Sequence, residues 1–416
     1  MKNLIIVILL AGLATTSSAD TFRIEIDYMV DTSLGNAHSH MPTQAEIDAV
    51  VQMFACQGHT LIIDVDDQIT HYDVLQLDPN DRDNFFGFSG TNDSFKAIKD
   101  ANFDNGDGWH YAIFGHQYEW RRQETDGSWT YFDSGSSGLG ERGGDDFVVT
   151  LGTFSGQTGT PFDKASTLAH EFGHNLGLSH CGVSDCSDIG PNMPNLGSVM
   201  SYNYQLEGVR SGLLCNQLIP ESADWLFKEL DYSGGRLCPL DETNLDETVG
   251  TLFRAVDWDC DGSLSTSTSQ DLSTDGPTWC SNAGNLETIA DFNEWGSIQS
   301  NAAMSPDLLR TQRFPLEPCI TSEEVTALRR KAECAQPTLS TESCVSGRTY
   351  WVKGSGSSSG TGSCNRAVDT VARGLAVSTP NSALILEPRT YSESGATGLV
   401  IDEDIVIYSA KSTIIR

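Results

Sequence analysis

The sequence has few cations for its length. Of its 416 residues, 25 are Lys or Arg and 57 are Asp or Glu, which gives a formal net charge of −32 at pH 7. Nucleic acids and anionic membranes are bound through clustered Lys and Arg side chains. The shortage of cations therefore argues against both kinds of partner. The hydrophobic content of 38% is high enough to build folded cores, so the composition also argues against disorder.

Long apolar runs are also missing, apart from one at the N-terminus. Residues 1–19 contain Lys2, an apolar run from Leu4 to Leu13, and small residues that end at Ala19. This run is shorter than the roughly 20 residues that span a bilayer, and no cysteine typical of a lipoprotein follows it. The pattern predicts a signal peptide over residues 1–19, cleavage after Ala19, and a secreted protein (extracellular or periplasmic) without a membrane span. A membrane anchor is the alternative.

No cysteine lies in the first 19 residues, and all eleven follow them. In an oxidising compartment disulfides are their expected state. Cys56 stands alone in a helical pattern and is expected to be a buried thiol. Four of the others form one group with three possible connectivities: Cys181, Cys186, Cys215 and Cys238. The last six form three local pairs: Cys260 with Cys280, Cys319 with Cys334, and Cys344 with Cys364.

The negative charge is unevenly distributed. Residues 20–230 contain 32 acidic and 10 basic residues, residues 231–318 contain 15 and 4, and residues 337–416 contain seven of each. These shifts predict a domain over 20–230, a loop-rich acidic region over 231–336, and a separate module over 337–416. Short strands in the last region suggest a small β-rich module, and a parallel β-helix is an equally ranked alternative.

The pattern of residues 20–230 predicts an α/β (α+β) fold. Residues 21–30 alternate as a strand, 42–58 form an amphipathic helix, and 59–67 form a second strand. Residues 109–120 and 145–154 are expected to add two more strands, and 166–177 to begin a helix. This order is typical of a mixed sheet with a buried helix.

Residues 170–180, HEFGHNLGLSH, carry the strongest functional signal. His170 and His174 are four residues apart, so both imidazoles lie on one helical face and can reach one metal ion. Glu171 lies beside the open coordination position, where a carboxylate can accept a proton from water. Gly177 allows a turn with positive φ, which would return His180 to the ion. Three neutral nitrogens and one open position are typical of catalytic zinc.

This motif resembles that of the metzincin zinc endopeptidases, HExxHxxGxxH followed by a methionine turn. The candidate turn is Ser198–Tyr202, in which Met200 would form an apolar floor beneath the histidines. The resemblance covers about residues 168–204, and it implies a metzincin-like catalytic domain that acts on protein or peptide substrates. Glu171 would be the general base, and Tyr202 matches a tyrosine that stabilises the oxyanion in some metzincins. The chain lacks the family's recognisable propeptide switch.

A second metal site is predicted from residues 257–265. Aspartates at Asp257, Asp259 and Asp261, with glycine next, match the beginning of an EF-hand-type calcium loop. The match fails at the twelfth position, which is Thr268 instead of glutamate. Further ligands for the predicted structural Ca²⁺ are Ser263, Asp291 and Asn293.

Three classes of function follow from these motifs. The first is a secreted zinc endopeptidase, the second a non-peptidase zinc hydrolase, and the third a noncatalytic calcium-dependent binding or adhesion protein. The remaining histidines (38, 40, 59, 71, 110 and 116) lack the spacing of ligands to the zinc site, and His38-Ser39-His40 is expected to be a surface loop.

Overall fold

The computed structural model describes residues 20–77, 91–123, 129–133, 135–182, 190–209, 230–235, 237, 239–248, 256–272, 284, 286–302, 321, 349–352, 359, 369–377, 382–386, 390–391, 405–409 and 414–415. The predicted signal peptide, residues 1–19, lies outside the described residues, as do all cysteines except Cys56, Cys181 and Cys260. Within the described ranges, no helix combines the length and apolarity that crossing a membrane requires.

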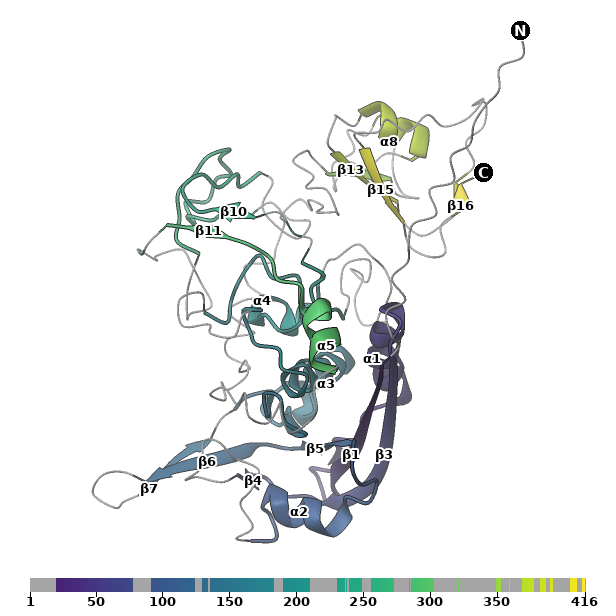
Figure 1. Ribbon diagram of the computed structural model, residues 1–416, viewed down its shortest axis with the longest axis vertical. Helices are drawn as coiled ribbons and strands as arrows, with labels where there is room; N and C mark the ends of the chain where they lie inside the picture. The colour runs from purple at the N-terminus through teal and green to yellow at the C-terminus, as the bar shows by residue number, and fades with distance from the viewer. Residues whose placement is uncertain are drawn as a thin grey trace.

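A mixed sheet forms the centre of the N-terminal region, as the sequence predicted (Figure 1). Four of its strands pair in parallel, in the spatial order β3, β1, β5, β9. Two short strands are antiparallel: β8 pairs with β9 at one edge, and β2 pairs with the end of β1. Their bounds are β1 Thr21–Asp31, β2 His38–Ser39, β3 Thr60–Thr70, β5 His110–Gly115, β8 Gly138–Gly140 and β9 Asp146–Thr150.

Helices cover both faces of this sheet. Alternate residues of β5 show the two cores: Ala112 and Phe114 belong to one hydrophobic cluster, and Tyr111 and Ile113 to the other. The first cluster includes residues of α1 (Gln44–Cys56) and α3 (Pro161–Asn175), and the second includes residues of α2 (Phe95–Asn102). The central strands are therefore buried on both faces, which explains why they are nearly continuous apolar runs.

Helix α3 is held at both ends. It begins with a capping box in which the Thr160 side chain and the Asp163 side chain each accept a main-chain N–H of the other residue. Lys164 forms a 2.9 Å ion pair with the buried Glu46 of α1, which joins the two helices on the sheet. The helix ends before Gly177, whose φ of 91° is the positive value that the sequence predicted.

The single strand predicted over residues 109–120 is wrong. The segment forms two strands, β5 and β6 (Tyr118–Gln123), which belong to different sheets. The chain leaves the central sheet at His116, whose main-chain oxygen accepts a 2.7 Å hydrogen bond from the N–H of Gly152. Strand β6 pairs instead with β7 (Trp129–Asp133) and β4 (Leu75–Gln76).

The later elements are shorter. They include η2 (Ser155–Gln157), α4 (Tyr202–Gln205), the pair β10 (Leu240–Asp241) and β11 (Thr288–Ile289), and α5 (Glu294–Ala302). Near the C-terminus, three strands pair in parallel: β12 (Thr349–Val352), β13 (Ser382–Leu386) and β15 (Ile405–Ser409). Helix α8 (Val371–Val377) lies beside β13 (Figure 1). A second parallel pair consists of β14 (Thr390–Tyr391) and β16 (Ile414–Ile415). Parallel pairing is compatible with the β-helix alternative, which stays a prediction.

Candidate active site

Three histidines converge at the C-terminal end of α3. His170 and His174 lie on the helix, and His180 follows the turn at Gly177. The Nε2 atoms of His170 and His174 are 3.2 Å apart, those of His174 and His180 are 2.9 Å apart, and those of His180 and His170 are 3.2 Å apart. Four ligands at about 2.0–2.1 Å from a zinc ion in tetrahedral geometry are about 3.3 Å from one another. The triangle of nitrogens therefore fits one face of a zinc tetrahedron.

Main-chain oxygens set the tautomers of two of these rings. The Nδ1–H of His170 donates to the oxygen of Val199 at 2.8 Å, and that of His174 donates to the oxygen of Leu178 at 3.0 Å. A carbonyl oxygen only accepts, so the proton is on Nδ1 and each Nε2 presents a lone pair to its neighbour. Two such lone pairs 3.2 Å apart repel each other unless a cation lies between them.

Burial keeps these rings neutral. His170 is fully buried and His174 is 6% exposed. Desolvation lowers the pKa of both imidazoles well below the usual value, and the neighbouring His180 lowers them further. Because a metal binds the neutral imidazole, no proton has to be displaced at neutral pH.

Met200 lies directly beneath the helix. Its side chain is fully buried, and a Cβ added to Gly173 would lie 2.4 Å from its Sδ atom. Gly173 stands between the two helical histidines in the sequence, so the absence of a side chain there lets the methionine approach the helix backbone. Met200 as an apolar floor beneath the histidines stays a prediction.

Tyr202 lies beside the histidines. It begins α4, and its main-chain N–H donates to the oxygen of Pro191 at 3.0 Å. Its ring centroid is 4.5 Å from that of His180 and 6.2 Å from that of His170. The aromatic ring is thus in the shell around the convergent nitrogens.

Glu171 belongs to α3, and its fully buried side chain packs against the edge strand β8. A Cβ on Gly138 would lie 2.4 Å from its Oε1 atom, and a Cβ on Gly140 would lie 2.7 Å from its main-chain oxygen. The two glycines of β8 therefore allow the strand to pack directly against the Glu171 side of the helix. Their contribution was missed from the sequence, although the Gly-Leu-Gly pattern is the signal of a close backbone approach.

The predicted calcium loop folds around its own carboxylates. Asp257 accepts the N–H groups of Asp261 at 3.1 Å and Gly262 at 2.9 Å, and Asp261 accepts that of Ser263 at 2.7 Å. Gly262 has a φ of 87°, as the sharp turn requires. At the twelfth position, the hydroxyl of Thr268 donates to Asp259 at 2.7 Å.

Glu247 joins this loop, which the sequence did not indicate. Its carboxylate and those of Asp257 and Asp259 each offer an oxygen within 4.8 Å of the others. The remaining predicted ligands have other contacts: Asp291 accepts from the hydroxyl of Ser233 and the N–H of Leu237, and Asn293 accepts the N–H of Gly296 in α5. Calcium at this loop stays a prediction.

The expected surface loop at His38-Ser39-His40 is wrong. His38 and Ser39 form β2, and His40 is only 3% exposed. Both histidines lie together with His71 and His116, which directly follow β3 and β5. The predicted strands, 59–67 and 109–120, did not end at these histidines, so only the fold shows that His71 and His116 lie at neighbouring strand ends.

The comparisons with known proteins do not extend these observations. A scan against models of protein families found no match, and a search of curated proteins found no similar sequence. The candidate active site therefore depends on its own sequence motif and geometry.

Proposed function

We propose that this protein is a secreted zinc-dependent endopeptidase. The observation that carries the proposal is the convergence of the Nε2 atoms of His170, His174 and His180, with Glu171 on the same helix. The sequence motif and the buried Met200 support it, because both resemble the active site of the metzincins. Three imidazole ligands fit zinc and leave one coordination position for a reactant.

Zinc at this site would polarise the scissile carbonyl and lower the pKa of a water molecule to about 7. The protein's own groups then carry the proton transfers. The Glu171 carboxylate accepts a proton from the attacking water and delivers it to the leaving amine. The Tyr202 hydroxyl donates a hydrogen bond to the oxyanion that forms as the carbonyl is attacked.

The cysteines support the proposed secretion. Cys181 and Cys260 are disulfide-bonded, which is the expected state in an oxidising compartment. Cys181 follows His180 directly, so a disulfide there anchors the segment that carries the third ligand. The proposed substrates are proteins or peptides.

Digestion of casein or gelatin tests the proposal. The purified protein should cleave these substrates, lose activity with a zinc chelator, and regain activity when zinc is added back. A folded, zinc-loaded protein that cleaves neither would contradict the proposal and favour a non-peptidase zinc hydrolase or a calcium-dependent binding protein.

A further inference from the structure

A second group of histidines lies at the carboxyl edge of the parallel strands. It consists of His38 in β2, His40 just after it, His71 after β3 and His116 after β5, and we call it the four-histidine cluster. One ring nitrogen from each residue lies within 4.8 Å of the other three. The group shares no residue with the candidate active site.

The arrangement of the rings is tetrahedral. The Nε2 of His38 and the Nδ1 of His116 are 3.3 Å apart, which is about the separation of two ligands on a zinc tetrahedron. The six distances between ring centroids range from 4.9 Å to 5.6 Å. A square-planar arrangement would make two of the six about 1.4 times as long as the others, so this range favours metals of tetrahedral preference, of which zinc is the commonest.

Two ring nitrogens of the cluster have no hydrogen-bond partner in the described structure. The Nε2 atoms of His40 and His71 are buried and have no hydrogen-bond partner among the described residues. A buried polar atom without a partner destabilises the fold. One cation at the centre would satisfy all four nitrogens at once.

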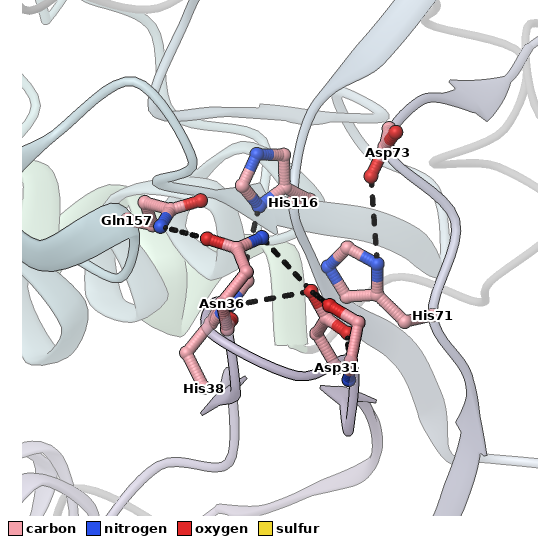
Figure 2. A network of polar contacts seen from close by, with 8 residues as sticks. Asp31, Asn36, His38, His71, Asp73, His116 and Gln157 are labelled. Atoms are coloured by element: carbon pink, nitrogen blue, oxygen red, sulfur yellow. Dashed lines mark hydrogen bonds and ion pairs between the residues drawn. The ribbon is translucent and has the colours of Figure 1, made fainter.

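The outer nitrogens of His38 and His71 have polar contacts (Figure 2). The Nδ1–H of His38 donates to the main-chain oxygen of Asn36 at 2.7 Å, and His71 Nδ1 lies 3.7 Å from the Asp73 carboxylate. The Asn36 side chain in turn donates to Asp31 at 2.9 Å and accepts from Gln157 at 2.7 Å. Such outer contacts are typical of metal-ligating histidines, because they fix the tautomer and the ring direction.

We propose that the four-histidine cluster binds a second, structural zinc ion. Four protein ligands close the tetrahedron and leave no position for a substrate, so this ion ties the segment after β1 to the ends of β3 and β5. The site is independent of the proposed peptidase activity.

Zinc stoichiometry by native mass spectrometry tests the site. Metal-stripped protein is reloaded with zinc chloride in a calcium-containing buffer and then dialysed. Wild-type protein should hold two zinc ions, and a variant that lacks the active-site ligands, H174A/H180A, should keep one. The variant H71A/H116A should also keep one, and the combined variant none. His59 belongs to neither site, so H59Q is the control variant. It should hold two zinc ions.

Cobalt provides a measurement that does not require the H71A/H116A variant to fold. In H174A/H180A, Co²⁺ should produce the intense visible d–d bands of a tetrahedral site. One zinc in the wild-type protein together with none in H174A/H180A, or the absence of these cobalt bands, would overturn the proposal.

Discussion

The Nδ1–H of His170 donates a 2.8 Å hydrogen bond to the main-chain oxygen of Val199, which directly precedes Met200 in the sequence. The segment that packs Met200 against Gly173 therefore also fixes the tautomer of the first proposed ligand. Packing and coordination are linked through one short segment, because a shift of residues 199–200 would alter both.

Loss of the Tyr202 hydroxyl should slow catalysis without removing zinc. Tyr202→Phe is expected to lower kcat by about 10²-fold, since removal of one donor to an oxyanion typically costs about 10²–10³. Peptide hydrolysis and zinc content are measured on the same preparation. Tyr204→Phe is the matched control, because that hydroxyl donates to the oxygen of Pro194, and it should retain kcat. Equal kcat in both variants would remove Tyr202 from the mechanism.

A side chain at Gly173 should destabilise the fold. Alanine in a helix interior usually stabilises by about 1 kcal/mol relative to glycine. Here its Cβ would lie 2.4 Å from Met200 Sδ and 3.1 Å from a ring carbon of Tyr232, so we expect a net loss of about 1–3 kcal/mol. Urea unfolding of the metal-free protein measures the loss.

Gly115→Ala provides a control for that experiment. Its Cβ would lie 3.4 Å from the end of the Met29 side chain and 3.8 Å from Ile113 Cγ2, which are ordinary van der Waals distances. Gly115→Ala should lower the free energy of unfolding clearly less than Gly173→Ala does. A Gly173→Ala variant that is more stable than the wild type would show that the close packing of Met200 is not maintained.

Glu294 should make stability depend on pH. Burial raises its pKa to about 8 from 4.5, although hydrogen bonds from Ser198 and Ser233 oppose the shift. Between these values the folded state keeps a proton that the unfolded state has lost, so this contribution to stability declines as pH rises. Glu294→Gln should therefore gain stability relative to the wild type from pH 5 to pH 8, by at most about 1.4 kcal/mol per pH unit.

Urea unfolding at the two pH values provides the measurement for Glu294. Glutamine keeps an oxygen to accept the N–H of Ser233, which Glu294 accepts at 2.8 Å. The exposed Glu287 provides the control Glu287→Gln, whose profile should follow the wild type. Parallel profiles for Glu294→Gln and the wild type would contradict the prediction.

Calcium should stabilise the protein through the Asp257 loop. A ligand at 100 times its Kd stabilises the folded state by about 2.7 kcal/mol, which is visible as a rise in Tm. Asp259→Asn should abolish that rise, and Asp241→Asn, at the end of β10 and outside the carboxylate group, should retain it. A rise of equal size in both variants would place any calcium elsewhere.

The convergence of His170, His174 and His180 was predictable because the three residues are close in the sequence. His170, Glu171 and His174 follow from helical periodicity, and His180 from a glycine turn six residues later. The apolar runs also indicated most strands of the mixed sheet, although they merged β5 and β6 into one strand. Local geometry determined these features, so the sequence pattern was sufficient.

The other sites depend on contacts between distant segments. His116 joins His38 across 78 residues because β5 and β2 both lie along β1. Glu247 reaches the Asp257 loop by accepting the N–H of Trp258 at 2.7 Å, a contact without a periodic signal. Chain pairing determined these positions, and a single sequence does not specify that pairing.

The most direct test of the central proposal is peptide hydrolysis by Glu171→Gln. Glutamine keeps nearly the same shape but cannot accept a proton from the attacking water. The variant should bind as much zinc as the wild type and lose about 10²–10⁴-fold in kcat/KM. Wild-type hydrolysis by the zinc-loaded variant would contradict the role of Glu171 and the proposed mechanism.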